Sequence, residues 1–328
     1  MLARYLLAWL ILSSTISYVW PDLWTHEPDL FDPFKATTTG MISCLIGITM
    51  FAIGMMLPRD EVRQVIRRWP FVLGGTVVQY AAMPLLAFTI GTLLNIRGDA
   101  FLGLVVVGCV PGAMASNVLT MNARGNISYS VSLTTMATLL SPVAVPLLLG
   151  MALATDKSVS LSMSEVSLKL CLTVVGPVVA GHLLIQAFPS WKSQTRRRGA
   201  LVANLAILWI IAVVVGKHRE RIDQVHLQLL LALILINVCG YVAGFLGGRA
   251  MQLPVPMRRA LTLEVGMQNA GLGTWLALAL FPDTTVAIAP AIYTFGCMLT
   301  GTLLANIWSR LPTGSDQATN DSSRVMHP

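Results

Sequence analysis

The sequence predicts an all-α polytopic membrane protein whose ten transmembrane helices form two inverted five-helix repeats. Three observations support this fold class: the composition, the spacing of the apolar segments, and interruptions at matching positions in two of those segments. Of the 328 residues, 55% are hydrophobic and only 11% are charged. A soluble domain carries roughly twice that charged fraction. The composition therefore favours a chain that crosses the membrane several times.

Ten apolar segments are long enough to be membrane spans, which need about 20 residues with a range of roughly 17 to 25. They are residues 4–20, 38–57, 69–94, 99–122, 127–153, 163–188, 200–216, 226–249, 257–281 and 284–309. The first is kept as a helix because Trp20-Pro21-Asp22 is a poor cleavage site for a signal peptide. The seventh is short. Residues 1–310 thus form the predicted transmembrane domain, and residues 311–328 a disordered cytoplasmic tail.

The distribution of Lys and Arg predicts that both termini are cytoplasmic. With the N-terminus inside, the cytoplasmic segments hold 15 of the 22 basic residues, and this excess is the usual signature of orientation. One predicted outer segment does not follow this bias. It contains Lys217, Arg219 and Arg221, whose charge is only partly offset by Glu220 and Asp223. Orientation explains the net charge better than nucleic-acid binding does. The predicted location is the cell (inner) membrane.

The fourth and ninth spans are interrupted at equivalent positions of the two five-span halves. Residues 110–117 read Val-Pro-Gly-Ala-Met-Ala-Ser-Asn, and residues 264–273 contain three glycines. Irregular backbone at this depth has to line a cavity or be covered by protein. Paired interruptions of this kind are typical of secondary transporters, in which they mark a binding site near the middle of the bilayer.

Glu264 is the only one of the 15 acidic residues that lies well inside a span. A carboxylate there costs at least ~2.5 kcal/mol and needs a partner. Since no Lys or Arg occupies the middle of another span, the neutral oxygens of residues 266–269 favour a bound cation over an ion pair. Gln79, in the middle of the third span, could join Gln268 as a second cation ligand or make an interhelical hydrogen bond.

More neutral oxygens occur in the fourth and fifth spans. Ser116 and Asn117 follow the Pro-Gly interruption, and Ser130 and Thr134 are four residues apart on one helical face. Together with one carboxylate these groups suit Na⁺. The alternative is that the hydroxyl groups bond only to their own helix backbone or to a neighbouring helix.

The two interrupted segments resemble the bile acid:sodium symporter family. The resemblance is carried by Pro111 to Val118, Ala123 to Asn126, Ser130 to Thr134, and Glu264 to Leu272. It covers roughly residues 1–310, and the ten-span bacterial and organellar branch is the closer comparison. In that family, spans 1, 2, 6 and 7 form a panel domain, and spans 3–5 and 8–10 form a core domain in which the broken helices cross beside two sodium sites.

The resemblance also implies the ligands of those sites. The first sodium site would use Ser116, Asn117, Ser130, Thr134 and Glu264. The second would use Gln79, Glu264, Gln268 and the main-chain carbonyls of Val265 and Met267. The match departs at Ala113-Met114, where related bacterial proteins carry Gly-Thr facing the substrate. Met114 therefore predicts a less polar or differently shaped substrate contact.

The predicted function is sodium-coupled import of an organic anion by alternating access. Two Na⁺ beside one carboxylate leave a local charge near +1, and the N-terminal amides of half-helices beginning near Ala115 and Ala270 suit a carboxylate. The predicted substrate contacts are Met114, Ala115, Asn117, Asn269 and Ala270. The alternative is a proton-coupled carrier or cation antiporter in which Glu264 titrates. The spans lack a paired catalytic constellation, which argues against an enzyme.

The anion itself stays open at this stage. Bile acids, pantoate-like hydroxy acids, pyruvate-like keto acids and sulfated compounds all fit a pocket of this kind. The predicted partners are thus a small organic anion and the lipid bilayer, with no nucleic acid.

Overall fold

The structure, a computed structural model, describes residues 6–20, 32–57, 69–153, 162–222, 225–282 and 284–311. The predicted tail lies outside the described residues from residue 312 on. Within the described ranges the chain is all-helical, and its one extended pairing is an isolated antiparallel bridge between Gly112 and Gln268.

Seven helical segments in these ranges are long and apolar enough to cross a membrane, which confirms an all-α, multi-pass chain. They are Thr39–Met56 (α3), Trp69–Leu93 (α5), Ile127–Leu153 (α8), Met163–Ala187 (α9, the π-helical turn η3 and α10), Arg198–Ile222 (most of α11), Leu227–Ala250 (α12) and Ile288–Ser309 (α15).

The other three predicted spans contain shorter helices. The first holds α1 (Leu6–Val19). The fourth is divided into α6 (Gly98–Cys109) and α7 (Ala115–Asn122), and the ninth into α13 (Val255–Gly266) and α14 (Ala270–Leu280). Two further short elements are α2 (Pro33–Ala36) and the 3₁₀ turn η4 (Pro189–Trp191).

The predicted length of the seventh span, residues 200–216, is wrong. Helix α11 runs over Lys192–Ile222 and departs from helical geometry only at His218, where φ is −112° and ψ is 17°. Hydropathy marks where a helix leaves the apolar layer and not where its hydrogen bonding stops. Basic residues in the last turn are favourable because they face the negative end of the helix dipole, so the polar end of α11 stays helical.

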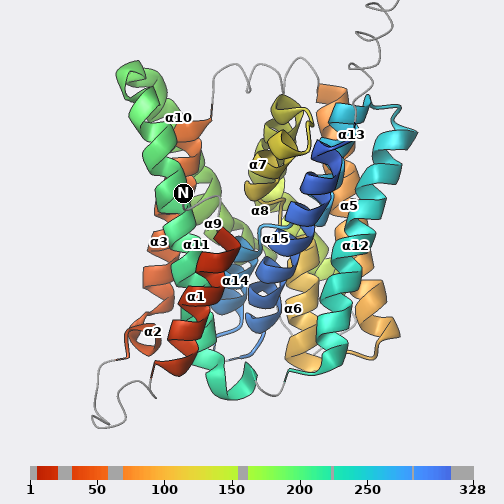
Figure 1. Cartoon of the computed structure of the whole chain (residues 1–328). Helices are drawn as coiled ribbons and strands as arrows, with labels where there is room; N and C mark the ends of the chain where they lie inside the picture. The colour runs from red at the N-terminus through yellow and green to blue at the C-terminus, as the bar shows by residue number, and fades with distance from the viewer. Residues whose placement is uncertain are drawn as a thin grey trace, which may run out of the picture.

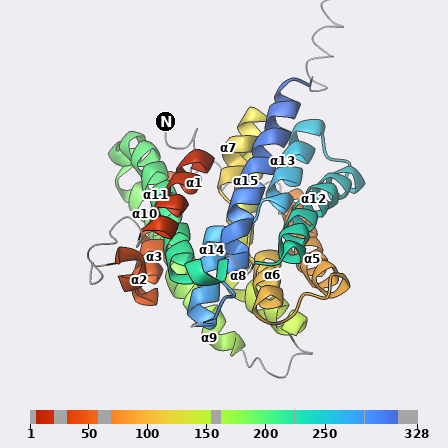
Figure 2. The same cartoon turned by 60° about the horizontal axis from the view of Figure 1, so that its bottom comes forward.

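The helices form two groups, visible on opposite sides of the molecule (Figures 1 and 2). In the first group α3 packs against α10 and α11, and α1 packs against α11. In the second, α12 packs against α5 and α13, and α15 packs against α6 and α7.

Glycines allow close packing within each group. A Cβ at Gly54 of α3 would overlap the Val178 carbonyl of α10, and one at Gly244 of α12 would lie 2.8 Å from the Leu261 carbonyl of α13. Small residues at such contacts let helix backbones approach where no hydrophobic effect drives association.

Candidate functional site

The two interruptions meet and satisfy each other's backbone groups. The Ala113 amide donates to the Met267 carbonyl, and the Asn269 amide donates to the Pro111 carbonyl, each at 2.8 Å. Helices α7 and α14 begin at Ala115 and Ala270, as the sequence predicted. Mutual pairing supplies the partners that water cannot offer at this depth, so the breaks are a stable feature of the fold.

Glu264 lies in the last turn of α13 with 0% of its surface exposed. The Ser116 hydroxyl donates to Glu264 Oε2 at 2.5 Å. The other oxygen, Oε1, is buried and has no hydrogen-bond partner among the described residues. The carboxylate comes this close to the first interruption because residue 112 is glycine, and a Cβ there would collide with it.

The hydroxyl groups predicted in the fourth and fifth spans gather beside this carboxylate. Ser130 and Thr134 of α8 are 0% and 5% exposed. Ser130 Oγ lies 3.3 Å from Thr120 Oγ1, and Thr134 Oγ1 lies 3.5 Å from Asn117 Oδ1. Thr134 also donates to the Ser130 carbonyl at 3.1 Å, so it makes both the interhelical contact and the bond to its own helix.

The glutamines of the second predicted group also meet. Gln79 Nε2 donates to Gln268 Oε1 at 3.3 Å, and Gln268 Nε2 donates to the Val265 carbonyl at 2.8 Å. Gln79 Oε1 is buried with no partner in the described part of the chain. The carbonyls of Val265 and Met267 each accept one hydrogen bond, and a carbonyl has a second lone pair available for a further partner.

Most of the predicted substrate contacts are less buried than the predicted ion ligands, and Asn117 belongs to both sets. Four of the five positions are half-buried, namely Met114, Ala115, Asn117 and Asn269. Ala270 is the exception, with 3% exposed. Asn269 Oδ1 accepts a hydrogen bond from the Leu272 amide at 3.1 Å, which caps α14 and fixes this side chain at the interruption.

Sequence reasoning missed the residues that hold the end of α13. Asn237 Nδ2 and the Tyr293 hydroxyl each donate to the Gly266 carbonyl at 2.7 Å, and Thr300 donates to Asn237 Oδ1 at 2.7 Å. Asn237 is a polar residue within a long apolar run, and this isolated polarity was the sequence signal that could have identified it. These donors belong to α12 and α15, and they hold the C-terminal end of α13 at the interruption.

Arg259 was also missed as a buried residue. It is 6% exposed, and its guanidinium donates to the carbonyls of Ala123 at 2.8 Å, Trp308 at 3.1 Å and Leu311 at 3.3 Å. These carbonyls lie at the C-terminal ends of α7 and α15, where a cation is favourable. Arg259 therefore fastens three elements of the second group at one end.

The donor set is chemically suited to a hard monovalent cation. Among the described residues no group of three or more His, Cys, Asp or Glu side chains could hold a metal ion. One carboxylate at a helix C-terminus, with hydroxyl, amide and carbonyl oxygens from interrupted helices, is the environment in which transporters coordinate Na⁺ or H⁺.

Residues 43–225 match the Sodium Bile acid symporter family. The chain belongs to this family. Over 302 residues it is 33% identical to the "Uncharacterized sodium-dependent transporter YocS" of Bacillus subtilis (strain 168). The matched region covers 92% of this chain and 90% of that protein. The resemblance found in the sequence is thereby confirmed.

Eukaryotic members of the sodium bile acid symporter family are also similar. The chain is 32% identical over 266 residues to the "Probable sodium/metabolite cotransporter BASS1, chloroplastic" of Arabidopsis thaliana, covering 80% of this chain and 65% of that protein. It is 25% identical to "Sodium/bile acid cotransporter 4" of Mus musculus, covering 81% and 62%. The chain is thus a multi-pass membrane protein of a sodium-dependent transporter family.

Proposed function

We propose that this protein is a symporter that imports an organic anion together with Na⁺ by alternating access. The observation that carries the proposal is Glu264 Oε1, a buried carboxylate oxygen without a partner among the described residues, at the point where two interrupted helices pair. The relatives are named as sodium-dependent, sodium/metabolite and sodium/bile acid transporters, which supports sodium as the coupling ion and an organic solute.

The proposed architecture is ten spans in two inverted repeats, with both termini cytoplasmic in the cell (inner) membrane. The panel domain comprises spans 1, 2, 6 and 7, and the core domain spans 3–5 and 8–10. Two features support this division. The interrupted pairs α6–α7 and α13–α14 occupy the fourth and ninth positions of the helix order. Helices α1, α3, α10 and α11 pack mainly with one another, as do α5, α12 and α13, while α15 also contacts α1 and α11.

Two sodium ions share Glu264 in this proposal. The first site uses Ser116, Asn117, Ser130, Thr134 and Glu264, and the second uses Gln79, Glu264, Val265, Met267 and Gln268. The contacts support a carboxylate shared by both groups, because the Ser116 hydroxyl donates to Glu264, and a Cβ at Gly112 would meet both the Glu264 carboxylate and Gln79 Nε2.

The anion occupies the N-terminal ends of α7 and α14, beside Met114, Ala115, Asn117, Asn269 and Ala270. Two Na⁺ against one carboxylate leave a charge near +1, which attracts an anion, and the positive end of the helix dipole suits a carboxylate group. Asn117 contacts Thr134 of the first ion group and also lies at the start of α7. Sodium binding thereby favours the substrate-binding geometry, within the limit set by the differential affinity of the two states.

The test is uptake of labelled pyruvate, pantoate and taurocholate into proteoliposomes with and without a sodium gradient. Glu264→Gln is expected to abolish sodium-stimulated uptake, and Glu165→Gln, which changes an exposed carboxylate on α9, to retain it. Full uptake by Glu264→Gln with an unchanged sodium dependence would end this proposal.

A second candidate is a proton-coupled carrier on the same fold. It is favoured by the burial of Glu264, because protonation satisfies a carboxylate in the interior as a cation does. Uptake in a sodium-free buffer under an imposed pH gradient separates the two functions. Uptake driven by the pH gradient alone supports proton coupling.

A further inference from the structure

A cavity of about 560 Å³ at one end of the molecule has four charged side chains among its nine lining residues. It lies where α2, the start of α3 and the last turns of α11 face the end of α14. Its lining includes the cationic Lys35, Lys217 and Arg221 and one carboxylate, Glu220. The balance of charge on the described lining residues is therefore positive.

This positive charge works against the predicted orientation of the chain. The end in question is the one that the sequence predicts to face outward, and Lys and Arg are usually concentrated on the cytoplasmic side. Three basic residues within positions 217–221 oppose that bias. Glu220 and Asp223 offset only part of this charge, and the remainder is more than orientation in the membrane predicts.

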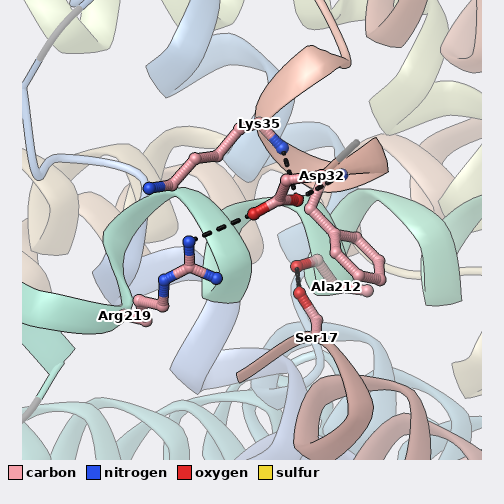
Figure 3. Close-up of polar contacts among 6 residues, drawn as sticks. Ser17, Asp32, Lys35, Ala212 and Arg219 are labelled. Carbon is pink, nitrogen blue, oxygen red and sulfur yellow. Dashed lines mark hydrogen bonds and ion pairs between the residues drawn. The ribbon is translucent and has the colours of Figure 1, made fainter. Parts of the chain in front are cut away.

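One nearby carboxylate, that of Asp32, is paired with Arg219 and not with a lysine or arginine that lines the cavity. Arg219 Nη2 donates to Asp32 Oδ2 at 3.1 Å, and both side chains are only 15–16% exposed. Asp32 also caps α2 by accepting hydrogen bonds from the amides of Phe34 and Lys35 at 2.9 and 3.1 Å. In Figure 3 the Lys35 side chain extends away from Asp32. Asp32 thus pairs with Arg219 and does not neutralise Lys35.

Neighbouring contacts fix the elements that carry these charges. Ser17 of α1 donates to the Ala212 carbonyl of α11 at 2.5 Å (Figure 3), and the ring of Phe34 lies 5.4 Å from that of Trp209. The bend of α11 at His218 turns the residues that follow it. The side chain of His218 lines the cavity, and its Nε2 is buried without a partner among the described residues.

The basic surface continues toward the other helix group. A second cavity of about 300 Å³ is lined by Arg221 as well, together with Arg97 before α6 and His226 before α12. Figure 1 shows α2, the end of α11 and the starts of α6 and α12 at the same end of the molecule. The cationic side chains therefore border the junction between the two groups.

Helix α14 connects this end with the proposed anion position. It has 11 residues, so its length is roughly 16 Å at 1.5 Å per residue. The residues that line the cavity are separate from the proposed ion ligands, so binding of an anion in the cavity is expected to be independent of Na⁺.

The geometry points to a second, sodium-independent binding site in this cavity for an organic anion bearing a carboxylate, where the anion collects before transport. The role in transport rests on the proposed function, whereas the binding does not.

Binding is tested by thermal unfolding of the full chain in detergent, in sodium-free choline buffer at fixed ionic strength, with pyruvate or pantoate added. The wild type, Glu264→Gln and Arg221→Lys are expected to be stabilised to the same degree. The apparent Kd is expected to rise roughly tenfold in Lys217→Gln and Arg221→Gln. Arg249→Gln, a charge loss at the exposed opposite end of α12, is the matched control and should bind as the wild type does.

The same variants separate the two proposals in uptake assays. Arg221→Gln is expected to raise the KM for the anion roughly tenfold, with kcat and the half-saturating sodium concentration unchanged. Three results would overturn the inference: neither carboxylate stabilises the wild type without sodium, Arg221→Gln and Lys217→Gln bind as the wild type does, or only vesicles of anionic phospholipid stabilise the chain. If sodium-stimulated uptake is absent but the sodium-free binding follows the expected pattern, the proposed function fails and the cavity site stands.

Discussion

At the scale of single residues, the contacts of Glu264 decide what the site requires. The carboxylate is fully buried, and its Oε2 accepts a hydrogen bond from Ser116. Removing a carboxylate from water costs several kcal/mol, whereas a hydrogen bond to a charged group contributes about 1.5–3 kcal/mol. The hydroxyl group alone therefore does not offset the cost, and in the proposed function a bound cation or a proton supplies the remainder.

The close approach of the two interruptions at Gly112 gives the first residue-scale prediction. Gly112→Ala places a Cβ against the Glu264 carboxylate, so we expect it to abolish stabilisation by sodium. Sodium at 100 times its Kd would stabilise the wild type by about 2.7 kcal/mol, and Gly112→Ala is expected to lose this gain. The measurement compares melting temperatures in sodium and choline chloride at equal ionic strength.

Gly296→Ala is the control for that experiment, because Gly296 also lies in a helix but no atom lies within 4 Å of the added Cβ. Sodium stabilisation of Gly112→Ala equal to that of the wild type would contradict the proposed position of the ion.

The Thr134 hydroxyl gives a second residue-scale prediction. Thr134→Val keeps the volume and removes the oxygen that contacts Asn117, so the half-saturating sodium concentration for uptake should rise roughly tenfold. Thr135→Val changes the next, half-buried residue of α8 and should have little effect. An equal shift in both variants would mean that the loss reflects α8 as a whole and not an ion ligand.

At the scale of elements, the end of α13 depends on donors from other helices. Asn237→Leu removes a donor to the Gly266 carbonyl and the acceptor for Thr300. We expect it to lower the free energy of unfolding by about 1–3 kcal/mol, measured by thermal denaturation in detergent. Gln228→Leu, at the exposed start of the same helix, should stay near the wild type, and equal losses in the two variants would refute the anchoring role.

The same scale shows which features the sequence could predict. Apolar runs located the helices, and Pro111, Gly112 and Gly266 located the breaks, because those signals are local. The length of α11 was missed since its polar ends remain helical. Asn237 and Arg259 were missed because their partners lie 29 and 136 residues away in the chain, and no local pattern predicts such contacts. The two interruptions were foreseen, but their direct backbone pairing was not.

At the scale of the whole molecule, side-chain hydrogen bonds among the described residues join α14 to α3 and α9. Trp275 Nε1 donates to Ser43 Oγ of α3 at 2.8 Å, and Lys169 Nζ of α9 donates to the Ala279 carbonyl at 3.1 Å. Each such bond contributes about 0.5–1.5 kcal/mol net. The difference between two populated conformations is a few kcal/mol, so exchange of these bonds is compatible with movement of one helix group against the other.

The last prediction concerns the number of spans, because neither α13 nor α14 is long enough to cross the bilayer alone. If the pair forms one interrupted span, reporters fused after Ala250 and after Pro282 lie on opposite sides. We expect green fluorescent protein to fluoresce at the first position, and alkaline phosphatase to be active at the second. Fusions after His226 and Ala250 bracket α12, which is long enough by itself, and serve as the control. The same side after Ala250 and Pro282 would make α13 and α14 a re-entrant pair, and the two five-span halves would no longer be inverted.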